Sequence, residues 1–299
     1  MNLLLVFNPR AGGGRSERLE SAIIEALAAF ARVDCHRTAG PGGAADWLAG
    51  RRLDAYDGVV AAGGDGTLFD VVNGLCAHAD GERPPLGVLP IGTGNAFARD
   101  LALEPGEWRR GVELIRAGRT RPLDVGHVAC AAGEYHFLNI IGAGLPVAAM
   151  LTAERLKAFG RSAYTVATLW QALRCHSEPF ELELDGERVV QDSLLVEIAN
   201  TRYTGTSFLI APDARMDDGL FDVVMVRRLP RRRLLRLFPS IYSGSHVRYP
   251  EVTLQRAREV RIRAPVGLPL APDGELRGAT PATVRCLPGY LEVFATAAS

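Results

Sequence analysis

The chain has 299 residues, of which 47% are apolar and 23% are charged, a composition typical of a globular protein with a sizeable core. Its 34 basic and 34 acidic residues cancel, which argues against a dedicated nucleic-acid-binding protein, because such proteins usually carry a basic excess. Apolar runs fall short of the ~20 residues that span a bilayer, and the N-terminus lacks the basic start of a signal peptide, so we expect a cytoplasmic protein.

The first hundred residues alternate between short apolar runs and segments with helical spacing. Each apolar run predicts a buried strand, and each strand is followed by a glycine-rich loop and an amphipathic helix. The three predicted strands cover residues 3–7, 59–62 and 86–89. This order predicts a Rossmann-like α/β domain with a parallel sheet, because a crossover helix lets consecutive strands run parallel.

The pattern changes near residue 123. Strands are predicted at 123–130 and 135–140, then a helical stretch at 147–173, and then a hairpin whose turn is Asp185-Gly186. Further strands are predicted at 194–198, 221–226, 259–262 and 291–295. We therefore expect an α/β domain over residues 1–124. A mainly antiparallel, sandwich-like β domain with inserted helices is expected over 125–299, with its last strand free to return to the first domain.

Three glycine-rich loops follow the predicted parallel strands, with the sequences NPRAGGG at 8–14, GGDGT at 63–67 and GTGN at 92–95. Ligands of open α/β sheets bind at the carboxyl edge of the strands, where glycine lets backbone N–H groups approach a phosphate. Asp65 would repel a phosphate unless a cation lay between them, so it suggests Mg²⁺. The hydroxyl groups of Thr67 and Thr93 are suited to donate to phosphate oxygens. The alternatives are ordinary turns or a dinucleotide site, although no strict GxGxxG opens the first helix.

The lysine and cysteine content of the chain excludes several kinds of functional site. Lys157 is the only lysine, so neither a Walker-type phosphate loop nor a protein-kinase site can form. Phosphate chemistry must then use backbone amides, arginines and metal ions. The cysteines form no CxxC pair, which predicts reduced thiols rather than disulfides or a zinc site. They are Cys35, Cys76, Cys130, Cys175 and Cys286.

Charged clusters mark the second half of the chain. The acidic clusters at 216–220 and 272–275 supply carboxylates suited to metal binding or proton abstraction, although Asp-Gly pairs are also ordinary turn formers. Residues 227–238 combine six arginines with leucines, which is typical of an amphipathic segment at an anionic membrane surface. The alternative is a solvated helix whose leucines face the core.

Taken together, these motifs resemble the soluble lipid kinases of the bacterial diacylglycerol kinase family, relatives of the sphingosine kinases. The resemblance covers nearly the whole chain. It implies an α/β nucleotide-binding domain, a β-rich domain, an active site in the cleft between them, and transfer of the ATP γ-phosphate to a lipid hydroxyl. The matching segments are Asn8-Pro9, GGDGT at 63–67, GTGN at 92–95, Asn139, Asn200, APDARMDDGLFDV at 211–223 and Asp273-Gly274-Glu275.

Carried over residue by residue, the resemblance implies that Asp65 organises a catalytic Mg²⁺ through water. It also implies that Glu275, with Asp273 close by, accepts the proton of the lipid hydroxyl. A second, structural Mg²⁺ would be held by the backbone carbonyl groups of Arg215 and Leu220 and by the carboxylate of Asp218. The implied ATP contacts are Asn8, Pro9, Arg10, Ala11, Gly12, Thr38, Gly64, Asp65, Gly66, Thr67, Leu68, Phe69, Asp70 and Thr93.

One departure leaves the substrate open. Many bacterial members have Asn-Asp after the third loop, where this chain has Asn95-Ala96, and sphingosine-kinase-like members also have Asn-Ala. Diacylglycerol-, sphingoid- and phosphatidylglycerol-like lipids all remain candidates. The rival functions are an NAD kinase-like enzyme that phosphorylates a soluble dinucleotide, and a nucleotide-binding protein without catalysis. The expected partner is a lipid, reached by peripheral contact with the inner face of the membrane, and not a nucleic acid. The sequence leaves a homodimer open.

Overall fold

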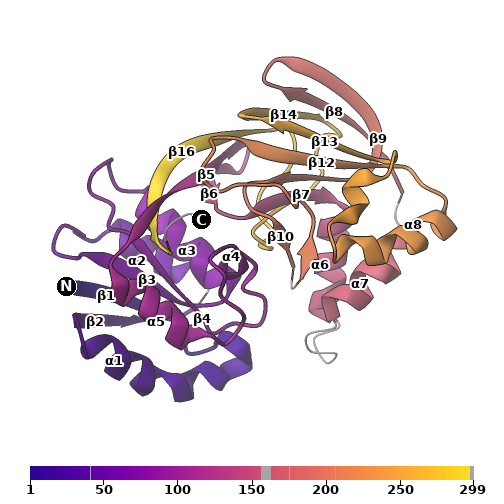
Figure 1. The fold of residues 1–299 in the computed structure, drawn as a ribbon. Coiled ribbons are helices and arrows are strands. Elements are labelled where there is room, and N and C mark those ends of the chain that lie inside the picture. The colour runs from indigo at the N-terminus through magenta and orange to yellow at the C-terminus, as the bar shows by residue number, and fades with distance from the viewer. Residues whose placement is uncertain (41, 156–162, 175, 206, 297–299) are drawn as a thin grey trace. The chain divides into compact units, whose positions relative to one another are not determined.

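The computed structural model describes residues 1–299 except 41, 156–162, 175, 206 and 297–299, and the described chain forms two compact units (Figure 1). The first unit comprises Met1–Val125 and Pro288–Ser299, and the second comprises Gly126–Leu287. Strands β5 (Thr120–Cys130) and β16 (Ala282–Phe294) each contribute residues to both units.

The first unit is built on a parallel sheet in the order β2-β1-β3-β4, as the three sequence repeats predict. Its strands are β1 (Asn2–Phe7), β2 (Arg32–Arg37), β3 (Gly58–Gly63) and β4 (Leu86–Pro90). The end of β16 runs parallel to β4, with Val293 beside Leu86. Because the strands are parallel, the loops that follow β1, β3 and β4 all leave from the same edge of the sheet.

Helices cover both faces of this sheet, which explains why its strands are continuous apolar runs. Leu3, Leu5 and Phe7 pack in one cluster with apolar residues of α1 and α5, while Leu4 and Val6 are also buried and point to the other face. The helices of this unit are η1 (Ala11–Leu19), α1 (Glu20–Ala28), α2 (Gly43–Ala49), α3 (Asp65–Cys76), α4 (Ala96–Asp100) and α5 (Trp108–Ala117).

The second unit contains a mainly antiparallel β structure, as predicted, with the strand order β13-β12-β9-β8-β14-β16. Strand β7 pairs with β9 and with β15, and β5 pairs with β6. The predicted hairpin is confirmed, since Leu184 of β8 pairs with Glu187 of β9 across Asp185-Gly186. The strands are β6 (Gly133–Phe137), β7 (Ile140–Gly144), β8 (Glu178–Leu184), β9 (Glu187–Ala199), β10 (Tyr203–Thr204), β11 (Phe208–Leu209), β12 (Phe221–Arg227), β13 (Val252–Ala257), β14 (Glu259–Ala264) and β15 (Leu270–Pro272).

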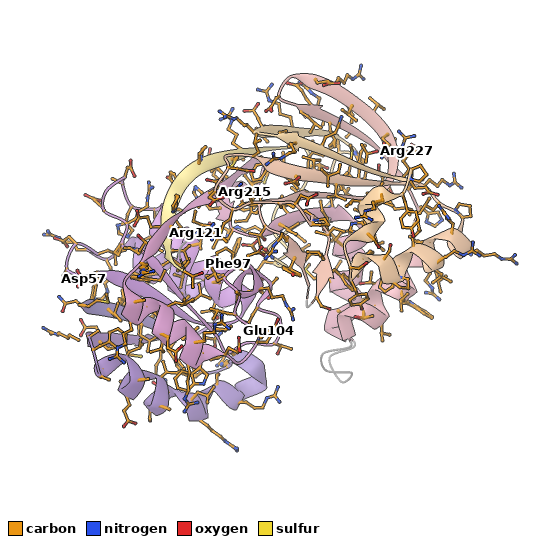
Figure 2. The ribbon with its side chains drawn as sticks, in the orientation of Figure 1. Asp57, Phe97, Glu104, Arg121, Arg215 and Arg227 are labelled. Carbon is orange, nitrogen blue, oxygen red and sulfur yellow. The ribbon has the colours of Figure 1, made fainter. Side chains whose placement is uncertain are left out.

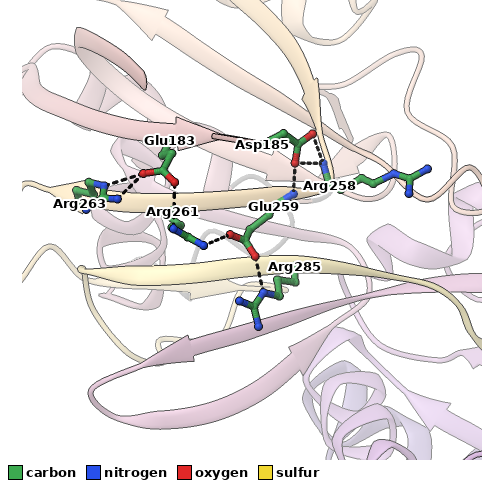
Figure 3. A network of polar contacts seen from close by, with 7 residues as sticks. All are labelled: Glu183, Asp185, Arg258, Glu259, Arg261, Arg263 and Arg285. Carbon is green, nitrogen blue, oxygen red and sulfur yellow. Dashed lines mark hydrogen bonds and ion pairs between the residues drawn. The ribbon is translucent and has the colours of Figure 1, made fainter. Parts of the chain in front are cut away.

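Charged side chains cross-link three neighbouring strands of this unit (Figure 3). Glu183 of β8 accepts from Arg261 at 3.0 Å and also pairs with Arg263, both on β14. Glu259 of β14 pairs in turn with Arg285 of β16 at 2.5 Å. These cross-strand pairs match the register of the sheet, because only side chains on the same face can meet in this way.

The inserted helices of the second unit are α6 (Leu145–Arg155), α7 (Ala163–Ala172) and α8 (Arg231–Leu237), followed by the short η3 (Phe238–Ile241) and η4 (Ser245–Arg248). The single helical stretch predicted at 147–173 contains the separate helices α6 and α7, which pack against each other. Lys157 lies between them, outside the described residues. In the part of the chain that the structure describes, no helix has both the length and the apolar character needed to cross a membrane.

Candidate active site

The first glycine-rich loop is held in shape by its own polar residues. Asn8 accepts a hydrogen bond at Oδ1 from the backbone N–H of Arg10 (2.9 Å), and its Nδ2 donates to Oγ1 of Thr67 (2.8 Å). The buried Ser16 hydroxyl lies 2.9–3.0 Å from the carbonyl oxygens of Asn8, Pro9 and Ala11. Sequence reasoning missed Ser16, whose only signal is a serine shortly after the glycines.

The glycines of this loop leave its backbone open to a ligand. Gly12, Gly13 and Gly14 have φ values of 58°, 72° and 84°, a region that other residues rarely adopt. A Cβ atom on Gly12 would lie 3.1 Å from the carbonyl oxygen of Ile91, whereas at Gly13 and Gly14 no described atom lies within 4 Å. The space beside the Cα atoms of Gly13 and Gly14 is therefore open to a phosphate group, while the N–H of Gly14 donates to the carbonyl oxygen of Arg10 at 3.2 Å.

Asp65 joins the second loop to the third. It is the first residue of α3, and its Oδ2 and Oδ1 accept hydrogen bonds from the backbone N–H groups of Asn95 and Ala96, both at 2.8 Å. Burial raises the pKa of Asp65 to about 6, against the two hydrogen bonds, which favour the charged form. The sequence suggested a loop-tip carboxylate facing a cation. The structure shows a half-buried carboxylate that caps α4, although each oxygen keeps a second lone pair for a water molecule or metal.

Close packing between the second and third loops explains their glycines. A Cβ atom on Gly92 would lie 2.3 Å from Cα of Gly64, and one on Gly94 would lie 2.3 Å from Oδ2 of Asp65. Asn95 adopts the left-handed region (φ 57°) and donates from Nδ2 to the carbonyl oxygen of Gly92 at 2.8 Å. The loops that carry GGDGT and GTGN therefore form one rigid surface, to which Ala96 contributes its backbone N–H.

The other predicted ATP contacts are spread around this surface. Thr38 is buried after β2, and its backbone N–H donates to the carbonyl oxygen of Phe7 at 2.9 Å. Asp70 accepts from the backbone N–H of Gly42 at 2.8 Å, which ties α3 to the start of α2. Leu68 and Phe69 are buried, whereas Thr93 is exposed. Hydrogen bonds thus link Asn8 to Thr67 and Asp65 to the third loop, while Thr38 and Asp70 support neighbouring elements.

In the second unit, Asp273 and Glu275 point in different directions. Both Asp273 (φ 47°) and Gly274 (φ 81°) are left-handed, and the N–H of Glu275 donates to the carbonyl oxygen of Pro272 at 2.7 Å, so the chain makes a tight turn here. Asp273 is half-buried and Glu275 is exposed. Because a turn separates them, the two residues do not lie side by side on one face of an extended strand.

Asp273 is occupied by backbone donors. Its carboxylate accepts from the N–H groups of Leu138 (2.9 Å), Asn139 (2.8 Å) and Ile140 (3.1 Å). Asn139 and Asn200, which the resemblance marks without a role, hold the same loop. Asn139 donates to the carbonyl oxygen of Tyr203 at 2.9 Å and Asn200 to that of Leu138 at 2.8 Å. Asp273 is therefore built as a positioning residue for the turn that presents Glu275.

The segment Asp218-Gly219-Leu220, which we call the DGL segment, lies close to Arg256. Asp218 accepts from the backbone N–H of Leu220 at 3.1 Å and forms an ion pair with Arg256. Arg215, labelled in Figure 2, forms an ion pair in which its Nε lies 3.4 Å from Oδ1 of Asp217. Among the described residues, no three acidic, histidine or cysteine side chains are close enough to form a metal site by themselves.

Asp222 adds a buried oxygen close to this segment. Its side chain is 2% exposed, and its Oδ2 has no hydrogen-bond partner among the described residues. Burial raises its pKa to about 6, and the nearby Asp218 and Asp213 add to the rise, while Arg256 opposes it. An orphaned buried oxygen beside further carboxylates fits a cation whose remaining ligands are backbone carbonyl groups or water.

Family models, related sequences and a solved structure all show a similarity to diacylglycerol kinases, and together they cover nearly the whole chain. Residues 2–128 match the family model described as the diacylglycerol kinase catalytic domain, and residues 139–295 match the YegS C-terminal NAD kinase beta sandwich-like domain. A diacylglycerol kinase of Mycobacterium tuberculosis (strain H37Rv) is 34% identical over 83% of this chain and 79% of its own length. One of Bacillus subtilis (strain 168) is 29% identical over 93% and 90%. The crystal structure of a Bacillus anthracis (strain Sterne) diacylglycerol kinase superposes with a TM-score of 0.82 and 25% identity, over 99% of this chain and 97% of that one.

Proposed function

The chain belongs to the bacterial diacylglycerol kinase family, a family of lipid kinases, and from this premise we propose that it transfers the γ-phosphate of ATP to a lipid hydroxyl group, with Mg²⁺ as the required metal. The observation that carries the proposal is the joined surface of the three glycine-rich loops. Phosphoryl transfer depends mainly on positioning and on neutralising charge, and this surface offers a preformed place for phosphate groups.

The loops of the first unit would bind the nucleotide. The bond between Asn8 and Thr67 and the bonds from Asn95 and Ala96 to Asp65 fix the loops before any ligand arrives. The backbone at Gly13 would then contact phosphate oxygens, and Thr93 is exposed enough to donate its hydroxyl hydrogen. Four further residues would support the loops around the nucleotide without contacting its phosphate groups: Thr38, Leu68, Phe69 and Asp70.

Two groups of residues fit a divalent cation. Asp65 would hold one through water, and Asp218 and Asp222 with neighbouring backbone carbonyl groups of Arg215 and Leu220 would hold another. Mg²⁺, when bound, supplies neutralisation of the negative charge on the phosphate groups. Arg256 pairs with Asp218 and, with its Nε 3.9 Å from Oδ1, also with Asp222, but Oδ2 of Asp222 has no hydrogen-bond partner among the described residues and would gain one contact from a cation.

We assign proton removal to Glu275 and the support of its turn to Asp273. Glu275 is exposed and can meet a substrate hydroxyl, whereas three backbone N–H groups engage the Asp273 carboxylate. A carboxylate that accepts the hydroxyl proton during transfer contributes typically ~10²–10⁴-fold to the rate. This assignment makes Asp273 a positioning residue and Glu275 the base.

Exposed apolar side chains on the helices of the second unit support a lipid substrate. Trp170 and Leu173 near the end of α7, and Leu235 and Tyr242 in and after α8, are 36–49% exposed. Tyr242 and Thr165 share a hydrogen bond (3.1 Å), so these helices form one surface. Leu235 belongs to the arginine-rich segment 227–238, whose first residue, Arg227, is labelled in Figure 2. Apolar and basic side chains together suit the surface of an anionic membrane.

The test is a direct comparison of acceptors. Purified protein is given ATP and Mg²⁺ with either a mixed lipid extract in micelles or NAD, and phosphorylated products are identified by mass spectrometry. We expect phosphorylated lipid and no phosphorylated NAD. Phosphorylation of NAD would favour the soluble-dinucleotide enzyme, and no transfer to any acceptor would favour a nucleotide-binding protein without catalysis.

A further inference from the structure

The second unit contains an apolar pocket between its sheet and its helices. Its walls come from β9 and β12 on one side and from α6, α7, α8 and η3 on the other. They include Leu145, Leu195, Val226, Leu234 and Phe238. The space between the walls is about 740 Å³, part of it open to solvent, but the centre of a water molecule can occupy only about 60 Å³ of it. A narrow apolar slot suits a hydrocarbon chain.

One carboxyl group lies in this mainly apolar wall. Glu197 of β9 shares its face of the strand with Leu195 and Ala199, both buried. Its cross-strand neighbour on β7 is Gly142, and a Cβ atom there would lie 3.7 Å from Cγ of Glu197. Glu197 thus lies against the bare backbone of Gly142, at ordinary van der Waals distance. The strand pattern favours an apolar residue here, so the carboxyl group needs a reason.

Glu197 has an unused polar atom. The residue is 2% exposed, and its Oε2 has no hydrogen-bond partner among the described residues. Burial raises the pKa of Glu197 to about 8, so near neutral pH the carboxyl group carries a proton and can donate it in a hydrogen bond. Thr168, Thr204 and His246 also line the pocket, and burial lowers the pKa of His246, which keeps its ring neutral.

The register of β7 relates Glu197 to the Asp273 turn, which carries the proposed base. Ile140 pairs with Ala199 and donates its N–H to Asp273, and Gly142 pairs with Glu197. Two residues along a strand correspond to roughly 7 Å. A lipid hydroxyl near the Asp273 turn would therefore place the next few bonds of the lipid beside Glu197. In an acylglycerol those bonds contain the ester groups.

We propose that this pocket binds the start of an ester-linked acyl chain and that the Glu197 carboxyl group donates a hydrogen bond to the ester carbonyl oxygen, which makes the protein select acyl esters over alkyl ethers. The inference rests on the proposed function, because it takes the Asp273 turn as the place of the reacting hydroxyl. Glu197 is then a specificity residue, which explains why an unpaired carboxyl group is kept in an apolar wall despite its cost.

The test uses two probes that differ only in the carbonyl groups, 1,2-dioctanoylglycerol and the matching 1,2-dioctyl glycerol ether, each in neutral detergent micelles. Binding and phosphate transfer are measured separately. Glu197→Leu removes the donor and fills the site with an apolar group, so it is expected to fold. Glu197→Gln keeps a hydrogen-bond donor. Glu187→Leu, at the exposed start of the same strand, makes the same substitution away from the pocket. Thermal unfolding checks that each variant is folded.

We expect the parent and Glu187→Leu to bind the ester about tenfold more tightly than the ether, the effect of one hydrogen bond. Glu197→Leu should bind both probes alike, and Glu197→Gln should keep part of the preference. Equal binding of both probes by the parent, or a full ester preference in Glu197→Leu, overturns the inference. A preference in binding without any phosphate transfer would leave the inference standing and count against the kinase function. Equal binding of both probes together with active phosphate transfer would overturn the inference and support the kinase function.

Discussion

Asp65 is the residue on which the nucleotide surface depends most. Asp65→Asn leaves one acceptor oxygen for the two N–H groups of Asn95 and Ala96 and places an amide donor against the other. We expect the free energy of unfolding to fall by about 1–3 kcal/mol and turnover to fall by at least ~10²-fold. Thermal unfolding and phosphate transfer at saturating Mg²⁺ measure both, with the exposed Asp80→Asn as the control. Activity within a few-fold of the parent would make Asp65 a simple turn residue.

Asp273 is expected to matter for stability, because its carboxylate accepts hydrogen bonds from three backbone N–H groups. Asp273→Asn weakens three backbone hydrogen bonds, from Leu138, Asn139 and Ile140. We expect a loss of about 1–3 kcal/mol in the free energy of unfolding. Denaturant unfolding of Asp273→Asn beside Glu275→Gln measures the difference, because Glu275 is exposed and its change should leave the unfolding curve in place. Identical curves for the two variants would refute the positioning role.

Glu197 makes stability depend on pH. Its pKa is about 8 in the folded protein and near 4.5 in the unfolded chain, so between these values the folded state binds more protons. The free energy of unfolding must therefore fall as pH rises through this window, by as much as about 5 kcal/mol in total. Glu197→Gln removes this dependence. Denaturant unfolding at pH 5 and pH 8 measures the free energy of unfolding of both proteins. The variant should be more stable relative to the parent at pH 8 than at pH 5. An equal difference in stability at the two pH values would contradict this prediction.

The sequence identifies the residues of the candidate site better than their partners. Glycine patterns and acidic motifs single out Asp65, Asp218 and Asp273 because each stands in a recognisable local pattern. The bonds from Asp65 to Asn95 and Ala96 span about thirty residues and depend on the packing of two loops. Buried polar residues such as Ser16 and Glu197 leave no trace in periodicity, because their partners or lack of partners arise only in the fold.

Helix α8 is the element on which membrane contact can be tested. Leu234 and Leu237 are buried, which fits the prediction that the leucines face the core, but Leu235 is 42% exposed. Arg231, Arg232 and Arg236 are exposed, whereas Arg233 pairs with Glu251 at 2.9 Å. The segment thus combines a core-facing side with a basic, partly apolar outer side.

Replacing Arg231, Arg232 and Arg236 with glutamine should weaken binding to anionic vesicles. Arginines near an anionic surface contribute about 1 kcal/mol each, so we expect a loss of at least ~10-fold that shrinks as salt is added. Vesicle flotation measures it. The matched control replaces Arg109, Arg110 and Arg116, which are exposed on α5 of the first unit. Equal losses in both triple variants would mean that only net charge matters, and no loss would make α8 a solvated helix.

Among the elements, local patterns predict well and long-range pairings do not. The Asp185-Gly186 hairpin is confirmed because both residues adopt the positive φ that such a turn requires. The helical stretch at 147–173 is divided between α6 and α7, a packing that helical periodicity alone does not reveal. The two-residue strands β10 and β11 are too short to show a pattern.

At the scale of the whole molecule, the alternation of strands and helices in the first unit and of strands in the second unit predicts the fold class. The parallel pairing of Val293 in β16 with Leu86 in β4 joins residues some two hundred positions apart, and no local pattern encodes it. The two units also carry different parts of the proposed chemistry. The nucleotide loops belong to the first, and Glu275 and the apolar pocket belong to the second.

The proposed reaction transfers phosphate from ATP to a lipid hydroxyl group, whose proton Glu275 accepts. The most direct measurement follows label from γ-labelled ATP into a micellar lipid extract, with ATP affinity measured on the same samples. We predict labelled lipid with the parent, and with Glu275→Gln a rate lower by ~10²–10⁴-fold at unchanged ATP affinity. Label that never enters lipid, or a Glu275→Gln protein that transfers it at the parent rate, would contradict the account.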